Sequence, residues 1–170
     1  MNINVVELKP ENAHEYLKLR QASEIEFPQY VGPSAERELL SGNAGIENVM
    51  SSYAGEGTAI FGAFSEERLI GVLGVSRRPS PKFKHRAFLW GMYVPCEYRK
   101  LKVATLLLSH VKSWAKNHPE VNVLWLQVTD TNAPAISFYR KHGFEIYGTE
   151  TQSLFTQGQY HTAHYMQICA

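Results

Sequence analysis

Three β-rich runs follow one another with no helical segment between them, and this order constrains the fold more than any other feature of the chain. Residues 58–64 (TAIFGAF), 68–78 (RLIGVLGVSRR) and 85–94 (HRAFLWGMYV) are rich in β-branched and aromatic side chains. Only the short polar segments 65–67 and 79–81 separate them. Because connections this short join antiparallel neighbours, the middle of the chain is predicted to form three consecutive antiparallel strands.

The segment after the third run predicts a strand–helix–strand crossover. Pro95 ends the run, and residues 99–117 (RKLKVATLLLSHVKSWAKN) place apolar side chains at helical spacing. Residues 121–128 (VNVLWLQV) are nearly continuously apolar, which is typical of a strand covered on both faces. A crossover of this kind joins two parallel strands and is expected to be right-handed.

The N-terminal part of the chain predicts one strand and two helices. Residues 3–8 (INVVEL) have strand character, and a helical pattern follows through residues 16–19. Residues 27–28 (Phe-Pro) break this helix, and Ser34 is the predicted cap of the second one.

The C-terminal part predicts a helix between strands. Residues 130–132 supply capping side chains for a helix over 133–141, which Gly143 closes. Strand character resumes at 144–147, and a last strand is expected over 160–168. The order predicts an α/β (α+β) fold, with a mixed, mainly antiparallel twisted sheet of about seven strands flanked by about four helices, in a single domain over residues 1–170.

Composition excludes several classes of function. A chain of 170 residues has the length of one domain, and 17 Lys and Arg against 16 Asp and Glu leave a net charge of +1. This charge is too small to favour nucleic acid or an anionic membrane surface. No segment reaches the roughly 20 apolar residues that span a bilayer, and no secretion signal is visible. We therefore expect a cytoplasmic protein with no nucleic-acid and no membrane partner.

The two cysteines, Cys96 and Cys169, have neither CxxC spacing nor a neighbouring cluster of metal ligands. They are expected to be free thiols, and no metal site is predicted. No His or Asp pattern supports an activated thiol at Cys96, so an acyl-cysteine intermediate is not expected.

A basic turn at the start of the crossover helix is a candidate anion site. Arg99, Lys100 and Lys102 lie where a strand leads into a helix. The free N–H groups and the positive dipole end of a helix start suit a phosphate or pyrophosphate. The residues alone describe a solvated basic turn equally well.

A second segment makes the pattern specific. Residues 132–144 read NAPAISFYRKHGF and directly follow LWLQVTD, and residues 99–104 provide an RxxxxA loop. In this order the two motifs resemble the GNAT family of acetyl-CoA-dependent N-acetyltransferases, and the likeness extends from residues 5–20 to residues 164–168.

The resemblance implies acetyl-CoA as the acetyl donor, no metal, and roles for named residues. Tyr139 would be the general acid that protonates the departing thiolate, since a neutral phenol can both hydrogen-bond and donate. The alternative for Tyr139 is a core aromatic on an amphipathic helix. The implied cofactor contacts are Met92, Tyr93, Val94, Arg99, Lys100, Leu101, Lys102, Val103, Ala104, Thr105 and Asn132.

Lys102 departs from the family pattern because it occupies the position of the loop glycine. A negative φ there would cost little, whereas a positive φ would carry strain of about 1–3 kcal/mol.

The general base is not evident from the sequence. Phe88 stands where the histone-acetylating branch carries a glutamate, and with Trp90 and Met92 it is expected to form one apolar face of the strand. His161 and His164 occupy the region where related bacterial sequences carry two acids. Either imidazole could relay a proton, although a surface or strand-paired histidine is the more ordinary reading.

These features predict an N-acetyltransferase that moves an acetyl group to a primary amine by direct attack. The acceptor would be a small molecule or a peptide, and a homodimer through the terminal strand is compatible with the pattern. The alternative is a non-catalytic domain of the same fold that binds acyl-CoA or has a regulatory role. A flavodoxin-like nucleotide-binding protein would alternate strands and helices throughout, which the three consecutive strand runs of residues 58–94 contradict.

Overall fold

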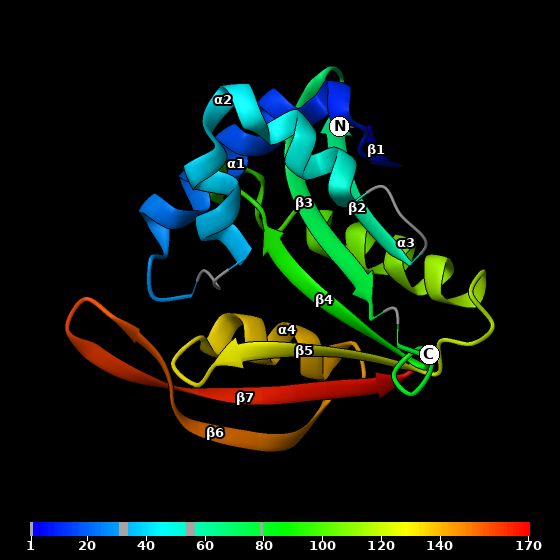
Figure 1. Ribbon diagram of the computed structural model, residues 1–170, viewed down its shortest axis with the longest axis vertical. Helices are drawn as coiled ribbons and strands as arrows, with labels where there is room; N and C mark the ends of the chain where they lie inside the picture. Colours follow the sequence, from blue (N-terminus) through cyan, green and yellow to red (C-terminus); the bar gives the residue numbers. More distant parts are fainter. Residues whose placement is uncertain (1, 31–33, 54–56, 79) are drawn as a thin grey trace.

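The computed structural model describes residues 2–30, 34–53, 57–78 and 80–170. Within these ranges seven strands form one sheet in the order β1-β2-β3-β4-β5-β7-β6 (Figure 1). β4 and β5 are parallel, and every other neighbouring pair is antiparallel. The predicted fold class, the three consecutive antiparallel strands and the central crossover are confirmed.

The strands are β1 (Ile3–Glu7), β2 (Thr58–Ser65), β3 (Arg68–Arg77), β4 (Arg86–Tyr93), β5 (Val123–Thr129), β6 (Glu145–Thr156) and β7 (Gln159–Cys169). The helices are α1 (Ala13–Glu26), α2 (Ser34–Tyr53, kinked at Gly42), α3 (Val103–Lys116) and α4 (Ala133–Lys141), with 3-10 turns η1 (Pro10–Asn12) and η2 (Cys96–Tyr98).

Helices α3 and α4 pack on one face of the sheet. Leu107 and Val111 of α3 and Tyr139 of α4 are buried in one core with Leu124 and Leu126 of β5. This core carries the larger share of the buried apolar side chains and holds the crossover β4–α3–β5 in place.

Helices α1 and α2 pack on the opposite face and contact β2, β3 and β4. In Figure 1 they lie above β4, while β5, β7 and β6 extend below them. Among the described residues, no helix covers this second face of β5, β7 and β6. We call the uncovered part of the sheet the open face.

The prediction that β5 is covered on both faces is wrong. Leu124, Leu126 and Val128 are buried against α3 and α4, but Trp125 is only half-buried and Gln127 is exposed on the open face. The apolar run of β5 was misleading because Trp125, although apolar, lies on the open face.

The expectation that Phe88, Trp90 and Met92 share a face is also wrong. The β3–β4 register shifts between Val72 and Gly74, and Gly91 has φ +66°, so β4 bulges at this point. Trp90 packs with the α1–α2 core, whereas Met92 packs with the α3–α4 core. A bulge adds one residue to a strand and therefore reverses the alternation after it.

Two predicted boundaries change for local reasons. The helix expected over 99–117 begins at Val103, because Lys100 and Lys102 both have φ +64°. The strand expected over 144–147 is longer, because β6 continues through two irregularities to a turn at Gln157 and Gly158. The predicted capping role of Ser34 concerns a side chain outside the described part of the chain.

Candidate active site

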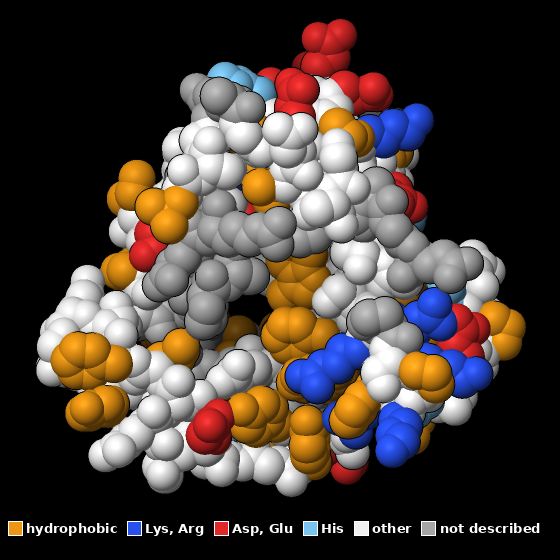
Figure 2. All heavy atoms as spheres, in the orientation of Figure 1, with side chains coloured by type: hydrophobic (Ala, Val, Ile, Leu, Met, Phe, Trp, Pro, Cys, Tyr) orange, Lys and Arg blue, Asp and Glu red, His pale blue; other side chains and the backbone are white. Residues whose placement is uncertain are grey.

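The parallel strands β4 and β5 separate at their carboxyl ends. Their last paired residues are Leu89 and Leu126, yet β4 continues to Tyr93 and β5 to Thr129. Beyond Leu89 the edge of β4 that faces β5 has no strand partner among the described residues, which leaves backbone donors and acceptors for an extended ligand. Figure 2 shows the surface hollowed between the α1–α2 part and the β5–β7 part, with hydrophobic side chains at the rim.

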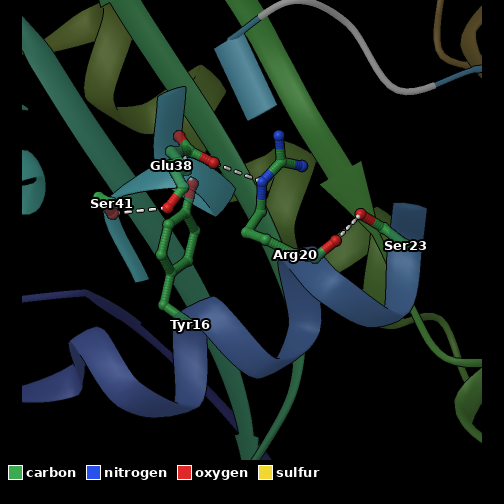
Figure 3. A network of polar contacts seen from close by, with 5 residues as sticks. All are labelled: Tyr16, Arg20, Ser23, Glu38 and Ser41. Atoms are coloured by element: carbon green, nitrogen blue, oxygen red, sulfur yellow. Dashed lines mark hydrogen bonds and ion pairs between the residues drawn. The ribbon is translucent and has the colours of Figure 1, made fainter. Parts of the chain in front are cut away.

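A buried polar cluster lies under the bulge of β4 (Figure 3). Arg20 Nε donates to Glu38 Oε2 at 2.6 Å, and the Tyr16 hydroxyl donates to Glu38 Oε1 at 3.0 Å. Arg20 and Glu38 are 3% and 0% exposed, so water screens this ion pair little. An added Cβ at Gly91 would lie 3.1 Å from a guanidinium nitrogen of Arg20. The cluster therefore ties α1 and α2 to the bulge.

Arg99 is held by protein groups beside the basic loop. Its Nε donates to the Val94 carbonyl at 2.9 Å, and its Nη2 donates to Glu26 Oε2 at 2.7 Å. The Tyr93 hydroxyl donates to the same Glu26 oxygen at 2.9 Å. The Arg99 charge is thus largely neutralised within the protein, a point that the basic-loop pattern did not predict.

The electrostatics of this cluster follow from its contacts. The hydrogen bond from Arg99 holds the pKa of the Glu26 carboxyl below its ordinary value, against a smaller opposing effect of burial. Burial, helped by Glu26, raises the pKa of Tyr93 to about 12. At neutral pH Glu26 is therefore an ionised, already paired carboxylate, which makes it a weak candidate for the general base.

The loop before α3 exposes backbone donors. Lys102, at the N-cap of α3, has φ +64° and makes no capping hydrogen bond with its side chain. Among the described residues, no group accepts a hydrogen bond from the N–H groups of Val103, Ala104 and Thr105. With the left-handed conformation of Lys100, this geometry suits an anion more than a closed turn.

Tyr139 projects from α4 with its ring in the core, in edge contact with Phe138 and Phe144. No described residue hydrogen-bonds its hydroxyl, and none of the buried polar side-chain atoms lacks a partner in the described part. The hydroxyl must therefore reach solvent-accessible space. Burial raises the pKa of the Tyr139 phenol well above its ordinary value, so the group stays protonated at neutral pH.

Asn132 has a structural role. Its Oδ1 accepts from the Ala135 N–H at 3.2 Å and so caps α4, as the sequence predicts. Its amide nitrogen donates to no described group, which leaves one polar atom for a ligand.

The sequence interpretation missed a polar cluster on the open face next to the separated strands. Gln127 follows the last β4–β5 pair, and its amide donates to Ser153 Oγ at 2.8 Å. Ser153 donates to Glu150 Oε2 at 2.9 Å, and the Tyr165 hydroxyl donates to the same oxygen. Glu150 has no cationic partner among the described residues, and the Tyr165 hydrogen bond lowers the pKa of its carboxyl. Gln127 and Tyr165 are directly paired across β5 and β7. The alternation of side chains along each strand could have predicted this contact only if the register of the two strands were known.

The two candidate histidines lie in different places. His164 shares a 2.9 Å hydrogen bond with Thr149, on the α4 side of the sheet, because it alternates with Tyr165. His161 pairs with Leu154 in the outer part of the β6–β7 hairpin, beyond the end of β5. Neither histidine belongs to the Glu150 cluster.

The connection after α1 lies over the end of β5. The Tyr30 hydroxyl donates to the Thr131 carbonyl at 3.2 Å, and Thr129 Oγ1 donates to the Gln29 carbonyl at 3.4 Å. Phe27 stacks on Tyr30 and also lies under the Arg99 guanidinium. These contacts hold the connection after α1 against the end of β5.

Three further features complete the description of the chain. In the part of the chain that the structure describes, no three His, Cys, Asp or Glu side chains gather as metal ligands. None of the described helices has the length and apolar character that a bilayer-spanning helix requires. Cys96 and Cys169 are both exposed free thiols.

Comparisons with known proteins agree with this geometry. The chain is 28% identical over 130 residues to the L-amino acid N-acetyltransferase AaaT of Escherichia coli K12, covering 76% of this chain and 72% of that protein. The fold matches the acetyltransferase of GNAT family from Streptococcus pneumoniae with a TM-score of 0.84 at 18% identity, over 99% of this chain and 100% of that one. It also matches Arabidopsis thaliana NAA60 in complex with acetyl-CoA with a TM-score of 0.76 at 19% identity, over 99% and 98%. A family model described as Acetyltransferase (GNAT) family matches residues 18–144, and the chain therefore belongs to this family of acyltransferases.

Proposed function

We propose that this protein transfers the acetyl group of acetyl-CoA to a primary amine. The observation that carries the proposal is the separation of β4 and β5 beyond Leu89 and Leu126, together with a Tyr139 hydroxyl that has no hydrogen-bond partner among the described residues. The relatives support the same chemistry, since one is named an amino acid N-acetyltransferase and another was solved with acetyl-CoA. The proposal treats residues 1–170 as one catalytic domain, because all described strands belong to one sheet.

In this proposal the cofactor enters between the separated strands. Its pantetheine arm pairs with the backbone of residues 92–94, in the manner of an added strand. The pyrophosphate binds the N–H groups of residues 103–105, with Lys100 and Lys102 adding charge and Leu101 lying in the same turn. Arg99 acts through the loop, since its guanidinium already binds Val94 and Glu26. The free amide nitrogen of Asn132 contacts the coenzyme from the start of α4.

Acetyl-CoA supplies an activated thioester, and the protein positions it. The amine nitrogen attacks the thioester carbonyl carbon, and the new carbon–nitrogen bond replaces the carbon–sulfur bond. A backbone N–H at the end of β4, near Val94, stabilises the developing oxyanion. Tyr139 donates its phenolic proton to the departing sulfur, and the proton lost by the amine restores the phenol through water. The products are the N-acetylated amine and coenzyme A.

Glu150 receives the incoming amine. It is ionised at neutral pH, faces the open side of the sheet and lacks a cationic partner among the described residues. An ammonium group is therefore attracted to it. Its lowered pKa makes it a poor base, so its role is to orient the amine while water removes the proton.

The alternative function, binding of acyl-CoA without turnover, is favoured by one observation. Lys102 holds a left-handed conformation that costs a non-glycine residue energy, in the loop that should bind the pyrophosphate. The cytoplasmic location and the homodimer stay predictions from the sequence.

The test is an acetylation screen. Purified protein is incubated with acetyl-CoA and a panel of amino acids, small amines and short peptides, and products are read by mass spectrometry while thiol release is followed. The proposal expects an N-acetylated product with one thiol released per acetyl transferred. Tight binding of acetyl-CoA by calorimetry, with no amine accepted, would instead establish the alternative.

A further inference from the structure

We propose that the acceptor carries an aromatic body and an anionic group remote from its amine, and that both bind in a groove on the open face. The groove lies around Arg86, and we call it the Arg86 groove. The inference rests on the proposed function, because it names the class of amine that the same site would acetylate.

Aromatic rings form the floor and one wall of the Arg86 groove. The groove has a volume of about 600 Å³ and is lined by Phe83, Phe88, Trp125 and Tyr147. Phe88 and Trp125 lie with ring centroids 4.5 Å apart on neighbouring strands. An uncovered aromatic surface of this kind, rather than a buried core, suits a flat apolar ligand.

The charge of the Arg86 groove has one sign. Arg77, Arg78 and Arg86 line it, and no carboxylate is among its described lining residues. Arg77 is paired with Glu120, which reduces its effect. Arg78 is exposed, lies over Phe83 and forms no ion pair with any described residue. Figure 2 views this face and shows Lys and Arg side chains beside hydrophobic ones below β4.

Arg86 is held in a fixed position. Its guanidinium lies 5.7 Å from the Trp125 ring centroid and 5.4 Å from that of Tyr147. Its Nη2 also donates to the Tyr147 hydroxyl at 3.2 Å and to Gln167 Oε1 at 3.4 Å. A guanidinium fixed between two rings keeps edge donors for an anion and loses little side-chain entropy when one binds.

The groove begins where the acetyl group would be delivered. Phe88 and Trp125 form the β4–β5 pair immediately before Leu89 and Leu126, after which the strands separate. The ring centroids of Trp125 and Tyr165 are 6.3 Å apart, and the Tyr165 hydroxyl donates to Glu150. The aromatic surface therefore extends from Trp125 to the Glu150 cluster. An amine at Glu150 therefore has the aromatic floor within its reach.

Length restricts the acceptor. Arg86 pairs with Val123, four residues before Gln127 along β5, which is about 13 Å at roughly 3.3 Å per residue. The α-carboxylate carbon of a free amino acid is only two bonds from its amine nitrogen, so this carboxylate cannot bridge the span. An extended chain of three residues spans about 10 Å, and an acidic side chain adds the remainder. The acceptor class is therefore an amine with an aromatic middle and a distant acid.

The probes are three C-terminally amidated tripeptides with free amino ends: Gly-Phe-Asp, Gly-Phe-Lys and Gly-Ala-Asp. We expect kcat/KM for Gly-Phe-Asp to exceed that for each of the other two by at least about tenfold at low salt. The preference for Asp over Lys should shrink as salt is added, because the arginines are partly exposed. Arg78→Glu should abolish the preference, whereas Lys18→Glu, the same charge change on exposed α1, should leave it intact.

A binding measurement separates this inference from the proposed function. Tryptophan fluorescence is followed on addition of N-acetylated Gly-Phe-Asp amide to wild type and to Trp125→Phe, at matched protein concentration. Saturable quenching that is lost in Trp125→Phe supports the groove even when no peptide is acetylated. Acetylation of all three probes within about twofold, or quenching unchanged by Trp125→Phe, would overturn the inference while leaving acetyl transfer itself intact.

Discussion

The parallel pair β4–β5 has two ends that offer a ligand different things. At the separated end the groups are backbone amides of β4 and the N–H groups at the start of α3, and the proposal adds the Tyr139 phenol. At the paired end they are side chains, with aromatic rings and arginines on an open surface. Backbone geometry can bind one cofactor in many sequences, whereas side chains vary freely and select an individual acceptor. We infer that chemistry and specificity are divided between the two ends.

Tyr139→Phe gives the largest effect, and it acts at the separated end alone. Loss of the hydroxyl should lower kcat by about 10²–10⁴, because proton donation to sulfur occurs in the transition state. Acetyl-CoA affinity and the order of preference among acceptors should hardly change, since the ring still packs. Steady-state kinetics with calorimetry measures both. Near-normal turnover under conditions where chemistry limits the rate would leave Tyr139 with a packing role only.

Glu150→Gln probes the junction of the two ends. We expect KM for the acceptor to rise about tenfold with a smaller change in kcat, as a charge-assisted hydrogen bond to the amine is lost. Glu47→Gln, at an exposed position of α2, is the matched control for charge. A fall in kcat at constant KM would instead identify Glu150 as part of the proton path.

Lys102→Gly tests whether the cofactor loop is strained. Glycine accepts φ +64° without a Cβ clash, but it also increases the entropy of the unfolded chain. The net gain in free energy of unfolding should be about 0.5–1 kcal/mol, measured by denaturant titration. Lys102→Ala loses the same charge and keeps the Cβ, so it should show no gain. Weaker coenzyme binding in both variants would show that the lysine charge outweighs the strain.

Glu26 gives the smallest effect and a defined pH dependence. Its pKa in the folded protein lies below the ordinary 4.5, so its contribution to stability is present above pH 4.5 and is lost as pH falls through the lower folded value. At pH 7 the free energy of unfolding of the wild type should exceed that of Glu26→Gln by about 1 kcal/mol or less, as expected for an ion pair that is partly screened by solvent. Urea titrations at pH 7 and pH 3 should show that this difference in the free energy of unfolding is smaller at the lower pH. A constant difference would mean that packing, and not the Arg99 contact, is responsible.

Much of the fold follows from local patterns in the sequence. The order of strands and helices, the crossover and the Asn132 cap are confirmed because periodicity and capping are local properties. The face of the sheet on which Met92 lies could not be predicted from the sequence. It depends on the bulge at Gly91, which in turn depends on the neighbouring strand and on Arg20 beneath it. The uncovered face of β5 was missed for a similar reason, because a single strand does not reveal which helices pack on it.

Some residues of the candidate site could be predicted from a local motif, whereas others are brought together only by the tertiary structure. The loop at residues 99–105 and Tyr139 are marked by a local motif, and the loop follows the separated end of β4. The roles of these residues stay predictions. The Glu150 cluster and the Arg86 groove join residues from different strands and have no local signature. Arg99 shows the limit of a motif, because its charge is used by Glu26, from a helix that the motif does not include.

The most direct test of the central claim is to map where coenzyme A binds by amide chemical shifts in an isotope-labelled sample. The account predicts that titration with coenzyme A moves the amide signals of residues 92–94 and 103–105 most, with smaller changes at Asn132. Signals of the paired end, at Arg86 and Phe88, should move little until an acceptor is added. Largest shifts at the paired end, with the α3 start unchanged, would contradict the division of cofactor and acceptor between the two ends.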